Sequence, residues 1–367
     1  MNLREGRIGI QEGVCLCVTA MCISGLFTLD PYKTYSKGNT GYITLPLAIF
    51  ASLIIFLIAM AVMKRTNMDN LSDMVEVALG RGGAGIASTI LLMSFILAAY
   101  VPLASFTQAM HALFYNGVEY GKLLLFIIPS VVIMAWLGFE AIGRAAKCFS
   151  WILIAVTALS LIGASSEFEV YRLYPLMAGG LKHNSKLVIC QTTVFLPAMA
   201  ATLITMKGLN GINSAKRIGI RSAVIAMIIC LVVQLAEGLT FEYIELSELF
   251  MPLYKINHLN LAENRLLRVD KIAQMVWLNG CILSASFYLY AGSAAFCRGF
   301  GIKDIRPSLA AAAVITVAAI LLEFSGTFSG MGEMKTAISL AGGAVITAMI
   351  LVSALLVLLK RKKRAAE

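Results

Sequence analysis

Residues 187–206, LVICQTTVFLPAMAATLITM, form an apolar stretch of membrane-spanning length with a proline, Pro197, near its centre. A second apolar stretch, near the start of the chain, carries Ile23-Ser24-Gly25-Leu26. Pro197 lacks the amide hydrogen that a helix uses, and Gly25 lets the backbone leave helical geometry. If the chain consists of two halves of five helices, these interruptions fall at matching positions. The pattern predicts a repeated fold with paired broken helices.

The remainder of the chain is equally apolar. Of its 367 residues, 59% are hydrophobic and 14% are charged, and the mean hydropathy is +0.84. At roughly 20 residues per crossing, this length accommodates about ten spans. Apolar stretches of that size occur at about residues 8–29, 42–63, 86–115, 122–140, 145–164, 187–206, 218–239, 269–297, 308–324 and 336–359. The sequence predicts a polytopic all-α membrane protein with a single transmembrane domain over residues 1–367.

The net charge of +10 reflects the orientation of the helices and not a nucleic-acid site. Basic residues lie mainly between the apolar stretches, where they orient spans, and they form no groove for phosphates. They are most frequent in the alternate segments that include both chain ends, and Lys360–Arg364 is the densest cluster. Both termini are therefore predicted to be cytoplasmic. The terminal cluster also suits contact with anionic lipid.

Catalytic and metal-binding patterns are missing from the sequence. His111, His183 and His258 are scattered, the cysteines form no C-x-x-C pair, and there is no nucleophile motif. Glu237 and Glu323 lie toward the external ends of their spans, so a buried carboxylate relay is not supported. We expect no enzymatic activity, no metal and no cofactor.

Paired half-helices suit a small zwitterion, because helix N-termini attract a carboxylate and free carbonyls attract an ammonium group. Glycine and proline are also common in ordinary spanning helices, so a kink need not be a site. Polar and aromatic residues available to line a cavity, or to bond one helix to another, are Thr19, Ser24, Tyr100, Ser105, Gln108, Gln191, Thr193, Asn279, Ser284 and Tyr288.

Three connections have distinctive compositions. The external segments 165–186 and 240–267 contain amphipathic pieces such as Tyr243–Phe250, which are typical of a vestibule cap or of a helix lying at the membrane interface. The internal segment 64–85 carries a glycine cluster at Gly80–Gly85. No strand precedes this cluster and no Gly-Lys-Ser/Thr follows it, so a flexible connection is favoured over a phosphate loop.

Three motifs occur in order along the chain. They are LGFEAIGR at Leu137–Arg144, LYPL at Leu173–Leu176 followed by Gly179-Gly180, and NRLLRVD at Asn264–Asp270 leading to Trp277. In their order and spacing, the motifs resemble the B subunit of bacterial spore germinant receptors, the GerAB family of the amino acid/polyamine/organocation permease superfamily.

The resemblance implies a LeuT-like bundle of ten helices in two inverted five-helix repeats, at about residues 8–164 and 187–360, whose first and sixth helices are broken. It implies a non-enzymatic subunit that binds a small germinant such as an amino acid and triggers germination. Such a subunit lies in the spore inner membrane beside A-type and C-type receptor subunits. The alternative is an amino acid transporter of the same superfamily.

The resemblance also implies a ligand pocket between the broken helices, with side walls from the third and eighth spans. Carried onto matching positions, it predicts a pocket formed by Ser24, Gly25, Leu26, Phe195, Leu196 and Pro197, with Tyr100, Ser284 and Phe287 as side walls. Many relatives place a glutamate in the sixth span, whereas this chain has Ala198-Met199-Ala200-Ala201. Glu140 and Arg144, four residues apart, are predicted to pair across one helical turn.

Overall fold

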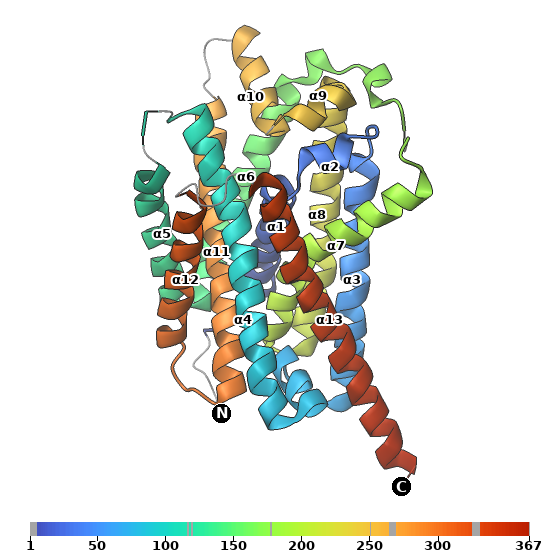
Figure 1. Cartoon of the computed structure of the whole chain (residues 1–367), viewed down its shortest axis with the longest axis vertical. Helices are drawn as coiled ribbons and strands as arrows, with labels where there is room; N and C mark the ends of the chain where they lie inside the picture. Colours follow the sequence, from blue (N-terminus) through green and yellow to red (C-terminus); the bar gives the residue numbers. More distant parts are fainter. Residues whose placement is uncertain are drawn as a thin grey trace.

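The computed structural model describes residues 6–115, 117–118, 120–176, 178–249, 251–263, 269–324 and 331–366. The long helices run roughly along one axis and form a bundle (Figure 1). They are α1 (Ile10–Phe27), α3 (Gly41–Thr66), α4 (Leu71–Leu113), α5 (Tyr120–Leu137), α6 (Phe139–Gly163), α7 (Gly180–Ile204), α8 (Ile212–Thr240), α11 (Val269–Phe300), α12 (Arg306–Phe324) and α13 (Met331–Ala366).

The chain is a multi-pass membrane protein. Within the described residues, eight helices are long and apolar enough to cross a bilayer, and shorter apolar stretches occur in α5 and α12. These ten helices coincide with the ten predicted spans. Large apolar side chains such as Phe50, Phe126 and Trp151 remain exposed on the outside of the bundle, as expected where lipid replaces water.

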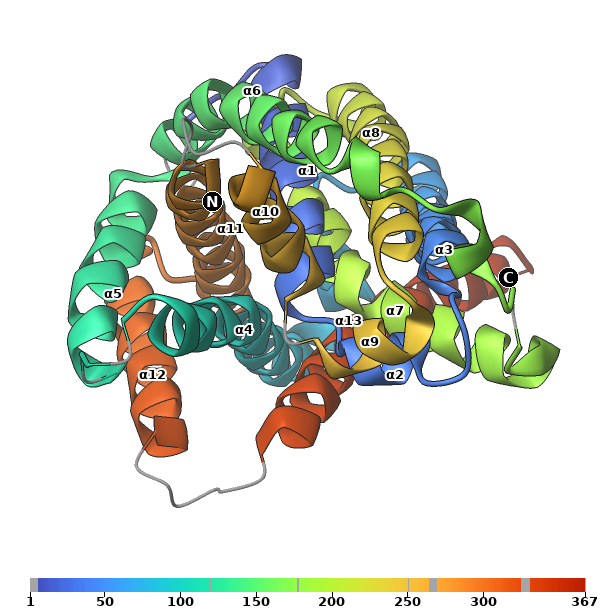
Figure 2. The same cartoon turned by 90° about the horizontal axis from the view of Figure 1, so that it is seen from above.

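Helix α1 lies inside the bundle. It packs against α4, α6, α7, α8 and α11, and Figure 2 shows it enclosed by its neighbours, with α5 and α12 on the outer side of α4 and α11. Most of its side chains are buried, including those of Thr19 and Ser24. A helix that is apolar on all sides is stable only in such a place. The architecture thus centres on α1.

Short helices cover one end of the bundle. They are α2 (Pro31–Tyr35), α9 (Tyr243–Glu248), α10 (Pro252–Glu263) and the 3₁₀ turns η1 (Ser165–Glu167) and η2 (Val170–Leu173). Helix α9 packs on α2 and α8, and α10 packs on α6, α8 and α11. Leu246 of α9 is fully buried. The amphipathic pieces in the connections therefore form a lid over the helix ends, which is the end predicted to be external.

At the opposite end, the segment with the glycine cluster is helical. Helix α4 consists of two helical stretches that meet at a kink at Gly80, whose φ of 77° and ψ of 172° are not helical. The connection predicted here is therefore a kink between two helices, and its flexibility stays a prediction. Lys360 of α13 donates to the carbonyls of Val77 and Ala78 at 2.9 Å each, and Arg361 donates to Arg65 O at 2.7 Å. The terminal basic residues thus bind carbonyls near the kink and at the end of α3.

Candidate functional site

The backbone of α1 does not open at the predicted interruption. Helix α1 is continuous through Ile23–Leu26, and Thr28 N donates to Ser24 O at 3.0 Å. The helix ends only at Phe27, three residues before α2. Glycine permits a break but does not force one, and an unpaired carbonyl in the bundle interior costs free energy. The expected half-helix dipoles at Gly25 are therefore absent from α1.

Helix α7 is likewise continuous through Phe195–Ala198, with Pro197 inside it. Pro197 has no amide hydrogen, so Thr193 O loses its helical donor. Gly343 of α13 packs directly onto this carbonyl, and a Cβ added to Gly343 would overlap with Thr193 O. Proline is tolerated in spanning helices where a neighbouring helix covers the freed group. The predicted interruption of α7 is a contact with α13.

A buried hydrogen bond joins α1 to α11. Ser24 Oγ and Tyr288 Oη are 3.0 Å apart, and Tyr288 Oη also lies 3.5 Å from Ala20 O. Ser24 is 3% exposed and Tyr288 is fully buried. Such a bond contributes about 1 kcal/mol net, but the loss of one partner strands the other. The pair holds α1 against α11 in the middle of the molecule.

Aromatic side chains pack on both sides of this bond. Toward the lid, Phe27 meets Phe106 and Trp277 edge-on, with ring centroids 5.4 and 6.3 Å apart. On the other side, Phe287 stacks between Tyr288 and Phe139, at 6.1 and 6.2 Å. Offset and edge-on pairs are favourable aromatic geometries. The ring packing closes the centre of the bundle toward both ends.

A narrow gap remains beside Gly25. Its volume is about 20 Å³, enough for about one water molecule. Helix α1 contributes Gly25 and Leu26, and α8 contributes Cys230 and Gln234; the other lining residues are Cys22, Leu45, Leu153, Thr157, Ile229 and Val233. A Cβ added to Gly25 would lie 3.3 Å from the Phe195 ring. Gly25 therefore keeps both the ring contact and the gap open.

The structure brings some of the predicted residues together and separates others. Ser24, Gly25 and Leu26 share one segment of α1, and Phe195 lies against Gly25. Phe287 reaches this group through Tyr288. The remaining predicted residues are buried within their own helices: Tyr100 in α4, Leu196 and Pro197 in α7, and Ser284, whose hydroxyl donates to Cys281 O at 3.2 Å in α11.

The α8 wall of the gap was not expected. Gln234 lines the gap and donates to Glu237 Oε2 at 2.8 Å, and Glu237 is 3% exposed. The sequence feature that could have indicated this wall is the pair of polar residues, Gln234 and Glu237, three positions apart in an apolar span. Of the motif residues, Glu140 and Arg144 form the predicted ion pair. Residues 264–268 lie outside the described part of the chain.

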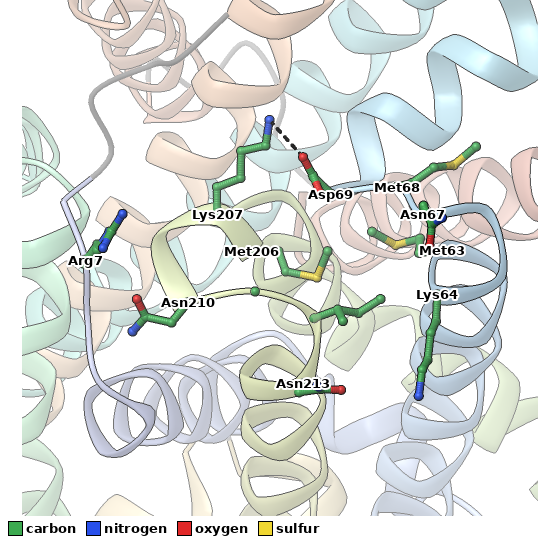
Figure 3. Close-up of a pocket in the computed structure, with 12 residues that line it drawn as sticks. Arg7, Met63, Lys64, Asn67, Met68, Asp69, Met206, Lys207, Asn210 and Asn213 are labelled. Atoms are coloured by element: carbon green, nitrogen blue, oxygen red, sulfur yellow. Dashed lines mark ion pairs between the residues drawn. The ribbon is translucent and has the colours of Figure 1, made fainter.

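A much larger hollow lies at the end of the bundle opposite the lid (Figure 3). Its volume is about 800 Å³. Lys207 and Asp69 form an ion pair across it at 3.7 Å, and its other lining residues are Arg7, Met63, Lys64, Asn67, Met68, Met206, Asn210, Gly211, Ile212 and Asn213. The central gap and this hollow thus differ in size and polarity.

Solved solute transporters share this fold. A Na⁺-coupled sialic acid symporter in an outward-open state aligns with a TM-score of 0.67 and 14% identity, over 93% of this chain and 78% of the symporter. MhsT in complex with L-phenylalanine aligns at 0.60 with 16% identity, over 94% and 89% of the two chains. The fold is therefore that of LeuT-like transporters.

Mhp1, a nucleobase-cation-symport-1 family transporter, allows two states of one protein to be compared. Its closed conformation aligns at a TM-score of 0.64 with 13% identity, over 94% of this chain and 78% of Mhp1. Its inward-facing conformation aligns at 0.57 with 12% identity, over 95% and 77%. Both conformations of Mhp1 therefore share the fold of this chain.

Sequence comparison assigns the family. No curated protein matches the chain in sequence. A family model described as spore germination protein matches residues 7–328, so the match ends before α13 begins and covers all the earlier spans. Taken with the transporter-like fold, this match shows that the chain belongs to the spore germination protein family of permease-type membrane proteins.

Proposed function

We propose that the protein is the small-molecule-binding membrane subunit of a spore germinant receptor and has no enzymatic activity. The gap beside Gly25, which is lined by residues of α1, α3, α6 and α8, carries this proposal. It is too small for an amino acid, so a ligand can bind there only if α1 moves relative to α8. Because binding would then favour the opened arrangement, occupancy becomes a conformational signal.

The residues around the gap indicate the kind of ligand. Leu26, Leu45 and Val233 offer apolar contacts, while Gln234 and Thr157 offer hydrogen-bonding groups. Pockets of this composition suit small amphipathic molecules. MhsT, which shares the fold, was solved in complex with L-phenylalanine. An amino acid is the ligand class that we propose for this chain.

The family supports a proposed cellular setting for the subunit. The subunit would lie in the spore inner membrane, with both termini in the cytoplasm and the lid of α9 and α10 facing outward. A-type and C-type subunits would be its partners. The Ser24–Tyr288 bond supports a signalling role, because its rupture would remove a buried polar link between α1 and α11 while Tyr288 keeps its stacking on Phe287.

Germination profiling of spores that lack this protein tests the proposal. We expect the response to one amino acid, or to one small group of them, to disappear while other germinants still act. Normal germination with every germinant tested would contradict a receptor role. Expression of the full chain in the same spores should restore the missing response.

The transporter alternative predicts net solute flux. The purified protein alone, reconstituted in vesicles and supplied with the amino acid identified by profiling, should show no concentrative uptake. Robust uptake without companion subunits would overturn the receptor proposal in favour of transport.

A further inference from the structure

Glu237 is a buried carboxylate with neutral partners. Tyr35 Oη donates to its Oε2 at 3.2 Å, and Gln234 Nε2 donates to the same oxygen at 2.8 Å. Within the part of the chain that the structure describes, no Lys, Arg or His lies within 4 Å of this carboxylate, and no hydrogen bond reaches Oε1. A carboxylate without a countercharge is costly to bury and marks a functional position.

A second gap lies directly beside Glu237, under the lid. It holds about 20 Å³ and is lined by Glu237, by Leu26 and Phe27 from the end of α1, by Trp277 from α11 and by residues 251–253 at the start of α10. Trp277 is 2% exposed, and its Nε1 has no hydrogen-bond partner among the described residues. A buried carboxyl group and one unused donor therefore border the same small space.

The two gaps follow one interface. Leu26 borders both of them, and Gln234, which lines the gap at Gly25, is hydrogen-bonded to Glu237 in the gap under the lid. Gln234 and Glu237 are three residues apart on α8 and so share a face. The two gaps thus share Leu26 as a wall, and both are bordered by α1 and α8.

We propose that Glu237 binds the ammonium group of the germinant in the gap under the lid, with Trp277 Nε1 donating a hydrogen bond to the polar group beside it. An ammonium group is close to a water molecule in size, so it fits the space, and it would supply the missing countercharge. Charge-assisted hydrogen bonds to a buried carboxylate are strong. This inference rests on the proposed function, because it assigns the amine end of the same ligand whose side chain would reach Gly25.

Binding to the purified full-length protein tests the site. Each of the twenty amino acids is added, and the unfolding temperature in detergent is measured. For any amino acid that stabilises the wild type, we expect Glu237→Gln to bind it at least about tenfold more weakly. Glu245→Gln is the matched control, since Glu245 is a half-exposed lid carboxylate paired with Lys255 at 3.3 Å. It should bind as the wild type does.

A second measurement needs no variant of Glu237. The deaminated analogue of the stabilising amino acid, which keeps the carboxylate and side chain, should stabilise the wild type at least about tenfold less effectively. Trp277→Phe should weaken binding of the amino acid severalfold while the ring packing remains. Sodium chloride at matched concentration should give no stabilisation.

The outcomes separate the inference from the proposed function. Unchanged binding to Glu237→Gln, equal binding of the deaminated analogue, or stabilisation by sodium alone would overturn the ammonium site while the receptor role stands. If no amino acid stabilises the wild type and spores without the protein respond normally, the receptor role fails and the ammonium site fails with it.

Discussion

Gly25 in α1 and Pro197 in α7 are alike in sequence and different in structure. Each is a residue that disfavours helical geometry in the middle of an apolar stretch, and yet each lies within a continuous helix. Gly25 faces a gap and keeps the Phe195 ring at contact distance. Pro197 frees a carbonyl on α7 that Gly343 of α13 covers. In both helices, a residue that weakens the helix therefore lies where a neighbouring helix packs closely. Whether that place can bind a ligand depends on the side chains of the neighbouring helix.

The largest effect on stability is expected at Gly343, where α13 packs on the carbonyl that Pro197 frees in α7. A Cβ at this position would overlap with a backbone carbonyl, which cannot rotate away as a side chain can. Gly343→Ala should cost about 3 kcal/mol or more, the upper end of the range for overpacking, and should greatly lower the amount of folded protein in the membrane.

Gly342→Ala is the matched control for that variant. Its added Cβ would find its nearest neighbours, Leu97 Cβ and Ser94 O, at 3.4 Å, which is ordinary contact. Thermal unfolding in detergent should therefore separate the two variants clearly. Equal stability of Gly343→Ala and Gly342→Ala would show that α13 does not seal Thr193.

The next effect is expected at Gly25 and concerns function more than stability. Gly25→Leu would fill a gap of about 20 Å³ and press on the Phe195 ring at 3.3 Å, a flexible neighbour that can shift. We expect the germinant response to be lost or strongly shifted, while abundance in the membrane stays near normal. Dose–response curves of spores, with immunoblots of their membranes, measure both quantities.

Gly82→Leu serves as the control for Gly25→Leu. Gly82 is also in a helix, but a Cβ added there would meet nothing within 4 Å. This variant should germinate as the wild type does. An unchanged dose–response for Gly25→Leu would remove the α1 site from the proposal.

A smaller effect is expected from the bond that holds α1 closed. Tyr288→Phe removes the hydroxyl that meets Ser24 Oγ at 3.0 Å and keeps the ring that stacks on Phe287. The loss of about 1 kcal/mol from the closed state should lower the half-maximal germinant concentration about fivefold. Ser24→Ala should act in the same direction.

A double-mutant cycle sharpens this prediction. If the two hydroxyls act through each other, Ser24→Ala combined with Tyr288→Phe should shift the response no further than Tyr288→Phe alone. Additive shifts would mean that each hydroxyl acts through other partners. A lower sensitivity in the single variants would contradict a role for the bond in the closed state.

The sequence predicts the fold well because the bilayer restricts it. Apolar stretches of spanning length must become helices whose backbone bonds are satisfied internally, so the ten spans and the short lid helix at Tyr243–Glu248 follow from composition. The Glu140–Arg144 pair also follows, since it depends only on spacing within one helix. Local rules are sufficient for these features.

The site could be predicted only in part, because its partners come from distant segments. Gly25 and Leu26 line the gap, and their role in binding a ligand stays a prediction, but the sequence does not say that Phe195 faces Gly25 or that Gln234 and Glu237 border gaps beside α1. Continuity of α1 depends on whether another group replaces its hydrogen bonds, and Thr28 keeps the bond to Ser24 O. The resemblance places Pro197 in the ligand pocket, and the sequence does not show that Gly343, far along the chain, covers the carbonyl that Pro197 frees.

The smallest effect is expected from Pro197→Ala. The new amide hydrogen would point toward Thr193 O, but α7 is already helical on both sides, and Gly343 already covers that carbonyl. The gain of one helical bond and the adjustment of α13 should nearly cancel, so the free energy of unfolding should change by less than about 1 kcal/mol. The germinant dose–response should stay within error of the wild type. If Pro197→Ala instead abolishes the response at normal membrane abundance, the proline shapes the ligand site. The two interruptions would then be equivalent after all, as the sequence alone suggests.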